Sequence, residues 1–196
     1  MRAGVWRCVV AALAVLPLAA CGAARDPVVS SAAAVPVGNW RVERQIDRIT
    51  GAPLSSAFLA TRNTSNSAVA FAQPGHMQLT CFKDQPVVRL AFSFRVGSTR
   101  NASVGYRFDE QPGHEPKVRI LPDFKTVMIE DKAEVARFVG ALATSKVLYV
   151  RIRSLNRGRS SAEYQLEGAP AAIDAALAGC PAAPPARAPR VSSLRS

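Results

Sequence analysis

Four arginines in the last third of the chain are the residues whose type and spacing best suit a binding chemistry. Arg151 and Arg153 lie two positions apart in a segment that alternates polar with apolar residues, and Arg157 and Arg159 follow in and after the next turn. A guanidinium presents a planar fork of donors that matches a carboxylate or a phosphate. Arginines on a half-exposed strand also protect sheet edges against aggregation. The sequence therefore predicts either a site for an anionic partner or a solvated, edge-protecting hairpin.

The remaining polar residues do not form a recognisable catalytic or metal site. The two histidines, His76 and His114, each follow a Pro-Gly pair, and we expect both to lie in loops. Asp109 and Glu110 form a carboxylate pair at the end of a predicted strand, where a solvated turn is the better interpretation. No serine lies in a nucleophile elbow, and no glycine-rich loop opens a helix. The sequence predicts no enzyme, no cofactor and no metal site.

The first twenty residues have the features of a secretory signal. Arg2 and Arg7 precede an apolar run, and small residues follow it without any acidic residue. The apolar or small stretch from Cys8 to Ala20 covers thirteen residues. A transmembrane helix, the alternative interpretation, needs about 20. We therefore expect residues 1–20 to be a signal peptide that directs export.

The end of this signal, Leu18-Ala19-Ala20-Cys21-Gly22, resembles the lipobox of bacterial lipoproteins. The resemblance implies a diacylglyceryl group on the Cys21 thiol, cleavage before Cys21 and acylation of the new N-terminus. Several acyl chains hold a protein far better than one, because each buried methylene adds about 0.8 kcal/mol. Gly22 replaces the aspartate that keeps lipoproteins in the inner membrane of two-membrane bacteria. The resemblance thus implies the periplasmic face of the outer membrane, where the organism has one.

Two of the four cysteines remain for the folded domain once the signal has been removed and Cys21 has been lipidated. These are Cys81 and Cys180, an even pair in an oxidising compartment, which favours a disulfide. On the chain-entropy model, closing a loop of roughly 100 residues stabilises the fold by about 4–5 kcal/mol. Two buried free thiols are the structural alternative. A catalytic cysteine is less favoured, because neither lies in a Cys-x-x-Cys motif or beside a histidine.

The charge of the chain favours anionic partners. Without Arg2 and Arg7, 23 basic residues face 14 acidic ones, which leaves the mature chain at +9. Between residues 39 and 180 the surplus is +6, from 19 bases and 13 acids. Phospholipid headgroups, lipopolysaccharide, wall polymers and acidic proteins are the partners that such a surplus favours. The expected compartment argues against nucleic acid, and we expect no nucleic-acid partner.

Composition divides the mature chain into three parts. Residues 21–38 are the lipidated N-terminus and a tether of small residues, and residues 39–180 are a β-rich globular domain. Residues 181–196 consist mainly of proline, alanine, serine and arginine without an acid, and we expect a disordered tail. Its arginines, Arg187, Arg190 and Arg195, contact an anionic surface or serve only for solubility.

Apolar periodicity predicts the elements of the domain. Val88, Leu90, Phe92, Phe94 and Val96 alternate and predict the central strand of the core. A second alternation pairs with it through a short loop, at Val104, Tyr106 and Phe108. Helical spacing then links Val135, Phe138, Val139 and Leu142, with Asp131 as N-cap and Glu134 as a capping-box residue.

Further along, Leu148, Val150 and Ile152 point inward on a strand whose other side carries Tyr149 and the arginines. The strand returns through a turn at residues 156–159, and Ala162, Tyr164 and Leu166 alternate on the return. Gly168-Ala169-Pro170 begins a second helix, with proline in its first turn. We expect a mainly β fold with two helices and one disulfide, either an antiparallel β-sandwich or a flattened barrel of about eight strands.

The order of these parts is similar to a type VI secretion-associated accessory domain, which also recurs in uncharacterised envelope lipoproteins. The similarity covers residues 40–180 and rests on short motifs, among them the strand at 104–109, the helix that ends at 138–142 and the basic strand at 150–153. It implies a disulfide-stapled β-rich fold and a non-catalytic role.

Three functions follow from these observations. The first is a lipid-anchored, non-catalytic binding or accessory protein that contacts an envelope protein or an anionic envelope polymer. The second is a carrier of lipid or a small ligand, which requires a deep apolar cavity between the sheets. The third is an envelope hydrolase, which requires converging polar residues. We expect the first.

Overall fold

A seven-stranded antiparallel sheet forms one layer of the fold in the computed structural model, which describes residues 29–31 and 34–181. Its strands lie in the order β10-β11-β8-β7-β5-β3-β2. In chain order they are β2 (Val35–Val37), β3 (Trp40–Glu43), β5 (Ser56–Ala60), β7 (His76–Phe82), β8 (Gln85–Ala91), β10 (Arg119–Ile120) and β11 (Thr126–Ile129). β1 (Val29–Ser31) and β4 (Gln45–Asp47) pair separately.

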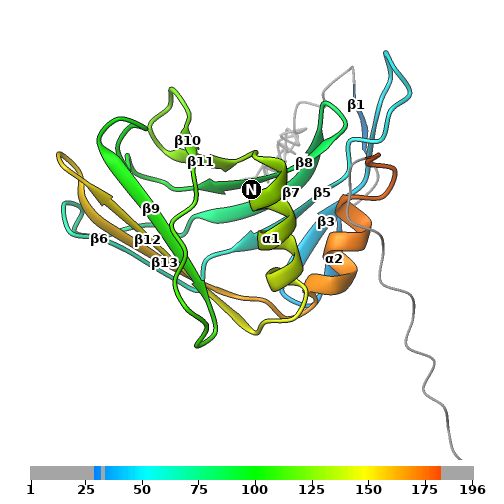
Figure 1. Cartoon of the computed structure of the whole chain (residues 1–196). Coiled ribbons are helices and arrows are strands. Elements are labelled where there is room, and N and C mark those ends of the chain that lie inside the picture. The colour runs from blue at the N-terminus through cyan, green and yellow to red at the C-terminus, as the bar shows by residue number, and fades with distance from the viewer. Residues whose placement is uncertain (1–28, 32–33, 182–196) are drawn as a thin grey trace, which may run out of the picture.

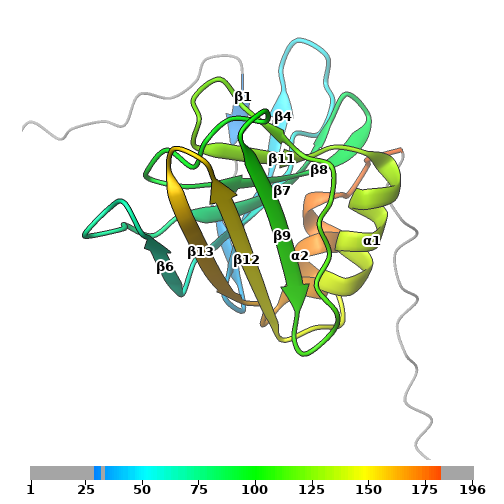
Figure 2. The ribbon, with the colours of Figure 1, turned by 60° about the vertical axis from the view of Figure 1, so that its left-hand side comes forward.

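A four-stranded antiparallel sheet and the two helices form the second layer (Figure 1). The sheet order is β6-β13-β12-β9, with β6 (Asn63–Asn66), β9 (Ala102–Phe108), β12 (Val147–Ser154) and β13 (Gly158–Gln165). Beside it, α1 (Lys132–Leu142) contacts β8, and α2 (Ala169–Ala176) contacts β3, β5 and β7. Figure 2 shows the small sheet and the helices side by side. One continuous apolar core lies between the layers.

The predicted fold is confirmed: the described chain is mainly β, with two helices, an antiparallel sandwich and one disulfide. The flattened-barrel alternative is wrong, since in the described residues both sheets end in open edge strands. The structure divides these residues into thirteen strands, not about eight. Several of the additional strands have only two to four residues, too short for a period of two to be read from the sequence.

The predicted central strand was partly wrong. β8 ends at Ala91, although Phe92, Phe94 and Val96 remain buried. The backbone leaves the strand ladder here, and the amide of Phe92 donates to the carbonyl of Lys125 at 3.1 Å. The chain then crosses to the other layer, so β9 pairs with β12 and not with β8. The alternation of apolar residues predicted correctly which residues are buried, but it does not show which strands pair with each other.

The helix α1 has the predicted N-cap and buried face, but Glu134 has a different role from the predicted one. The carboxylate of Asp131 accepts the backbone amides of Ala133 at 3.0 Å and Glu134 at 3.1 Å, which makes Asp131 the N-cap. The apolar face predicted for this helix is buried. Glu134 is not a capping-box residue, because its carboxylate bonds to the ring of His114.

The folded part begins earlier than predicted. Val35–Val37, expected in the tether, pairs with β3 across a turn at Gly38, whose φ is +58°. A Cβ on Gly38 would lie 2.4 Å from the carbonyl oxygen of Glu167, so this close approach requires glycine. Val29–Ser31 also pairs, with β4. Cys21, the predicted signal peptide at residues 1–20 and the part of the predicted tail from residue 182 lie outside the described residues.

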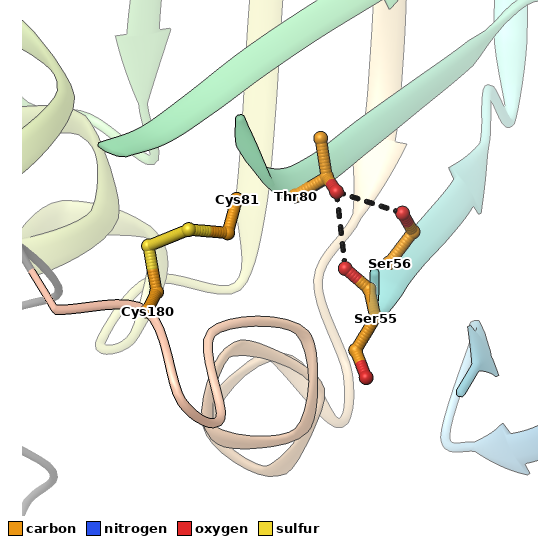
Figure 3. Close-up of a disulfide and its surroundings, with 5 residues drawn as sticks. All are labelled: Ser55, Ser56, Thr80, Cys81 and Cys180. Carbon is orange, nitrogen blue, oxygen red and sulfur yellow. Dashed lines mark hydrogen bonds between the residues drawn. A yellow bond between two sulfur atoms is a disulfide. The ribbon is translucent and has the colours of Figure 1, made fainter. Parts of the chain in front are cut away.

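The disulfide joins the end of β7 to the segment after α2 (Figure 3). Cys81 and Cys180 bond with their Cα atoms 5.8 Å apart. The prediction of a disulfide is confirmed, and the alternative of two free thiols is wrong. Nearby, the hydroxyl of Thr80 donates to the carbonyl of Ser55 at 3.0 Å and that of Ser56 donates to Thr80 at 2.9 Å. Of the helices in the described residues, none has the length and apolar character to cross a bilayer.

Candidate functional site: a basic face on the small sheet

The predicted arginines lie mainly on the outer face of the four-stranded sheet. Leu148, Val150 and Ile152 point into the core, so alternation turns the residues between them outward. We call the resulting surface the basic face and define it by Arg107 of β9, Tyr149, Arg151 and Arg153 of β12, and Arg159 of β13. The inward prediction for this strand is confirmed.

Arg153 and Arg159 stand directly opposite each other in the register of β12 and β13. Both are exposed, and neither forms an ion pair with any carboxylate of the described chain. Their side chains border a hollow of about 450 Å³ together with Ser67, Ser154 and Gly158. Two cations and the Ser67 hydroxyl thus border one open depression, an arrangement suited to a carboxylate or a phosphate.

Edge protection does not explain these arginines. β12 and β13 are the two central strands of the small sheet, with β6 and β9 at its edges. A charge protects an edge when it lies on the edge strand itself. Of the two interpretations that the sequence left open, an anionic site accounts for Arg153 and Arg159 better.

Arg151 and Arg107 lie further along the same face and already have partners. Arg151 Nη2 is 3.0 Å from Glu115 Oε1, and the guanidinium of Arg107 lies 5.2 Å from the centre of the Tyr149 ring. Arg107 also approaches Glu110, at 3.6 Å. A hollow of about 610 Å³ lies between these groups. Its walls are charged and aromatic, and Gly105 of β9 also lines it.

Arg157 is separated from the other three predicted arginines. It occupies the tip of the β12–β13 hairpin and borders a different hollow, with Arg95 and Phe124. Its backbone carbonyl accepts the side-chain amide of Asn66 at 3.3 Å, which anchors the tip to β6. The structure therefore brings Arg151, Arg153 and Arg159 together and places Arg157 at the rim.

The outer face of the seven-stranded sheet offers a contrast. Arg41 pairs with Glu43 at 3.1 Å, and Arg119 forms two bonds of 2.7 Å with Glu130. The guanidinium of Arg119 holds the pKa of the Glu130 carboxyl below its usual value. Arg89 donates to the side chain of Gln78 at 3.4 Å. Each of these three arginines has a polar side-chain partner, unlike Arg153 and Arg159.

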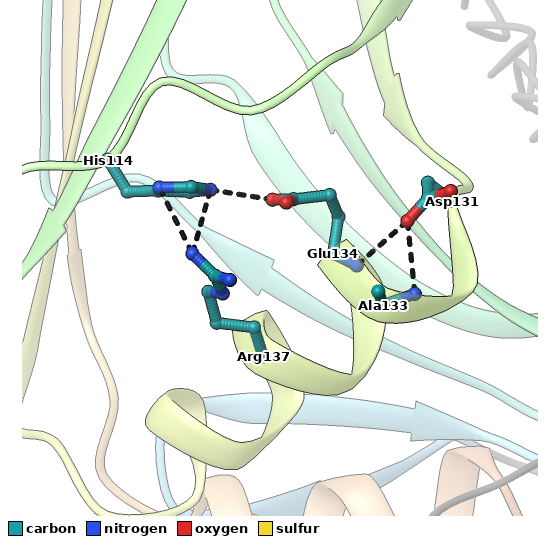
Figure 4. Close-up of polar contacts among 5 residues, drawn as sticks. All are labelled: His114, Asp131, Ala133, Glu134 and Arg137. Carbon is teal, nitrogen blue, oxygen red and sulfur yellow. Dashed lines mark hydrogen bonds and ion pairs between the residues drawn. The ribbon is translucent and has the colours of Figure 1, made fainter.

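His114 is the part of the site that sequence reasoning missed. Its Nε2 lies 2.7 Å from Glu134 Oε2, and Arg137 Nη1 lies 3.4 and 3.5 Å from the two ring nitrogens (Figure 4). Its backbone exchanges two hydrogen bonds of 2.9 Å with Tyr106. Far from being a free loop residue, His114 fastens the loop after β9 to α1 and carries Glu115 to Arg151.

Tyr106 lies beneath this histidine. Its ring centre is 5.4 Å from that of His114 and 5.0 Å from that of Phe138, and its side chain is buried. Burial, reinforced by the charge of Glu134, raises the pKa of Tyr106 to about 12. Its hydroxyl has no hydrogen-bond partner among the described residues. Tyr106, His114 and Phe138 thus pack together and position the His114 wall of the hollow of about 610 Å³.

His76 was also predicted to lie in a loop, and this prediction was wrong. It is the first residue of β7, and its ring centre lies 6.0 Å from that of Phe58. Desolvation, followed by the charges of Arg41 and Arg89, lowers the pKa of His76. Asp109, in contrast, serves the turn as expected: its Oδ1 accepts the backbone amides of Lys146 at 3.0 Å and Val147 at 2.8 Å.

Nothing in the described part of the chain gathers three residues suited to hold a metal ion. The two hollows on the basic face open to solvent and are lined with charged side chains, in contrast to the apolar cavity that a lipid carrier needs. What the face can do chemically is bind anionic groups. Compared with known protein families, curated proteins and solved structures, the chain matches none.

Proposed function

We propose that this protein is a lipid-anchored, non-catalytic binding protein of the cell envelope, and that its basic face binds an acidic envelope protein or polymer. The observation that carries this proposal is the cross-strand pair Arg153 and Arg159. Two cations in directly opposite positions destabilise a sheet unless an anion neutralises them. An external carboxylate or phosphate between them supplies that neutralisation.

The neighbouring groups support the same role. The Ser67 hydroxyl accepts the backbone amide of Arg159 at 3.0 Å and can donate its proton to an anion beside the arginine pair. The Tyr149 ring is partly exposed at the other end of the face. Exposed tyrosine and arginine side chains are enriched at interfaces between proteins. The surplus of +6 over residues 39–180 attracts acidic partners from a distance.

The anchor in this proposal rests on the lipobox resemblance of Leu18–Gly22. Mass spectrometry of the protein isolated from its own membrane tests it: the mature chain begins at Cys21 and carries the mass of acyl chains. An unmodified N-terminus, or a chain that retains residues 1–20, contradicts the anchor.

Binding is tested on the full chain with two defined probes, poly-L-glutamate for carboxylates and inorganic polyphosphate for phosphates. We expect the double variant Arg153→Ser/Arg159→Ser to bind the preferred probe about tenfold more weakly or worse, since charge-assisted bonds contribute about 1.5–3 kcal/mol each. The matched control, Arg41→Ser/Lys132→Ser, removes two exposed cations elsewhere and is expected to bind nearly as the wild type does. Equal losses in both variants would mean that net charge alone attracts the probe.

A further inference from the structure

We infer that one end of the molecule is a membrane-contact surface, which lies on the bilayer that holds the Cys21 lipid. This end is formed by the β4 hairpin (residues 45–54) and the β7–β8 turn (residues 82–85). This inference rests on the proposed anchor and adds an orientation to it. Its consequence is that the basic face points away from that bilayer.

Both ends of the described chain lie at this end of the molecule. β1 pairs with β4, and Cys180 is bonded to Cys81 near the end of β7. The two places adjoin, since a Cβ on Gly179 would lie 3.0 Å from the ring of Pro53 in the β4 hairpin. Figures 1 and 2 show β1, the β4 hairpin and the end of α2 on the same side.

The anchor cannot be far from this end. Val29 lies eight positions after Cys21, and a fully extended chain of that length reaches at most about 26–29 Å. The lipid therefore keeps the β1–β4 pair close to the membrane surface, whatever path the intervening residues take. The tail that follows Pro181 starts here as well, and its three arginines carry no acidic residue among them.

Large apolar side chains project from the same end. Ile46 is 53 % exposed, Ile49 79 % and Phe82 58 %. The register aligns Glu43 with Ser56 and Ser56 with Thr80. The β4 hairpin and the β7–β8 turn therefore extend beyond the same ends of neighbouring strands. Exposed isoleucine and phenylalanine on loop tips are suited to the boundary between headgroups and acyl chains.

Local contacts hold the β4 hairpin and the β7–β8 turn in conformations that expose Ile49 and Phe82. Asp47 Oδ1 accepts the backbone amide of Ile49 at 2.8 Å, and Asp47 Oδ2 accepts the Thr50 hydroxyl at 2.9 Å. These bonds fix the hairpin and direct Ile49 outward. In the neighbouring turn, Lys83 Nζ lies 5.6 Å from the centre of the Phe82 ring. A cation beside an exposed aromatic ring suits an anionic headgroup above an apolar layer.

The basic face lies elsewhere. Figure 1 shows the β12–β13 hairpin and the β1–β4 pair on opposite sides of the molecule. With β1 at the bilayer, Arg153 and Arg159 are therefore held away from its headgroups. The anionic partner of the proposed function is then not the membrane that anchors the protein.

Tryptophan substitutions in the full-length, lipidated protein test this orientation. Ile49→Trp and Phe82→Trp place the probe at the inferred contact, and Leu155→Trp places it at the tip of the β12–β13 hairpin, where Leu155 is 92 % exposed. The single tryptophan of the mature chain, Trp40, is buried and gives a constant background. Each variant is reconstituted in vesicles of phosphatidylethanolamine and phosphatidylglycerol, with and without brominated acyl chains.

We expect brominated lipid to quench the emission at positions 49 and 82 and to leave that at position 155 unchanged. A lipidated protein that shows no quenching at 49 and 82, or equal quenching at 155, overturns the orientation while the anchor stands. Dimerisation that Ile49→Ser abolishes would assign this surface to a second copy and likewise overturns the inference. An N-terminus without acyl chains overturns the anchor itself, and mass spectrometry of the same sample separates that failure from the others.

Discussion

Arg153 and Arg159 occupy opposite positions on the two central strands of the small sheet, and no carboxylate within the described residues pairs with either. Like charges placed directly across a ladder are destabilising, by the same order as favourable pairs stabilise, about 0.2–1 kcal/mol. The pair thus lowers the stability of the free protein and suits a bound anion.

The first prediction concerns the loss of stability that the pair Arg153 and Arg159 causes. Arg153→Ser should raise the free energy of unfolding by about 0.2–1 kcal/mol at low salt, because it removes the repulsion from Arg159. Urea unfolding measures it, and the gain should shrink as salt screens the two charges. Arg119→Ser is the matched control: it breaks the exposed pair with Glu130 and should lower stability by about 0–1 kcal/mol. A clear loss of stability in Arg153→Ser would contradict the unpaired-cation account.

A second prediction concerns the disulfide. Cys81→Ser/Cys180→Ser opens a loop with a sequence separation of 99 residues. On the chain-entropy model the loss is about 4–5 kcal/mol, because the unfolded chain regains its freedom. The midpoint of urea unfolding should fall strongly, and reduction of the wild-type protein should reproduce the shift. An unchanged midpoint would show that packing of α2 suffices without the bond.

The third prediction concerns the contact between His114 and Glu134. Glu134→Ala should weaken the attachment of the loop after β9, so the backbone amides of His114 and Tyr106 should exchange hydrogen faster. Asp131→Ala removes only the N-cap of the same helix and should cost about 1 kcal/mol. Its effect should be confined to the first turn of α1. If both variants accelerate exchange at the same amides, Glu134 supports the helix and not the loop.

A fourth prediction follows from the raised pKa of Tyr106. The folded group ionises near pH 12, whereas the unfolded one ionises near its ordinary value of 10.0. The folded protein therefore holds this proton more tightly, and the resulting stability is fully present below pH 10 and is lost as pH rises towards 12. Tyr106→Phe should flatten that alkaline loss, as urea unfolding at successive pH values will show. An unchanged slope would place the titration on Tyr164, whose pKa burial also raises.

Local patterns predicted the elements far better than their partners. The alternation from Leu148 to Ile152 and the helical spacing from Val135 to Leu142 each identified a buried face, because the spacing of apolar residues that marks such a face is local in the sequence. The pairing of β9 with β12 depends on a crossing between layers at residues 92–101, and nothing in a period of two encodes that crossing.

The same contrast between local pattern and long-range pairing applies to the candidate site. Spacing alone placed Arg151 and Arg153 on one side of a strand, and the turn brought Arg159 back beside Arg153. The sequence could not show that these strands are central in the sheet, which is what excludes edge protection. Nor could it bring His114 to Glu134, since twenty residues and a change of element separate them.

Photo-cross-linking in the cell tests the central claim most directly. A cross-linking residue at Ser161, which lies next to Arg151 in the register, samples the basic face, and one at Lys132 on α1 samples another surface. We predict a discrete cross-linked protein or acidic polymer from Ser161 that is absent from Lys132 and is lost in the Arg153→Ser/Arg159→Ser variant. The same products from both positions, or products that survive the double substitution, would contradict the claim that this face binds an anionic partner.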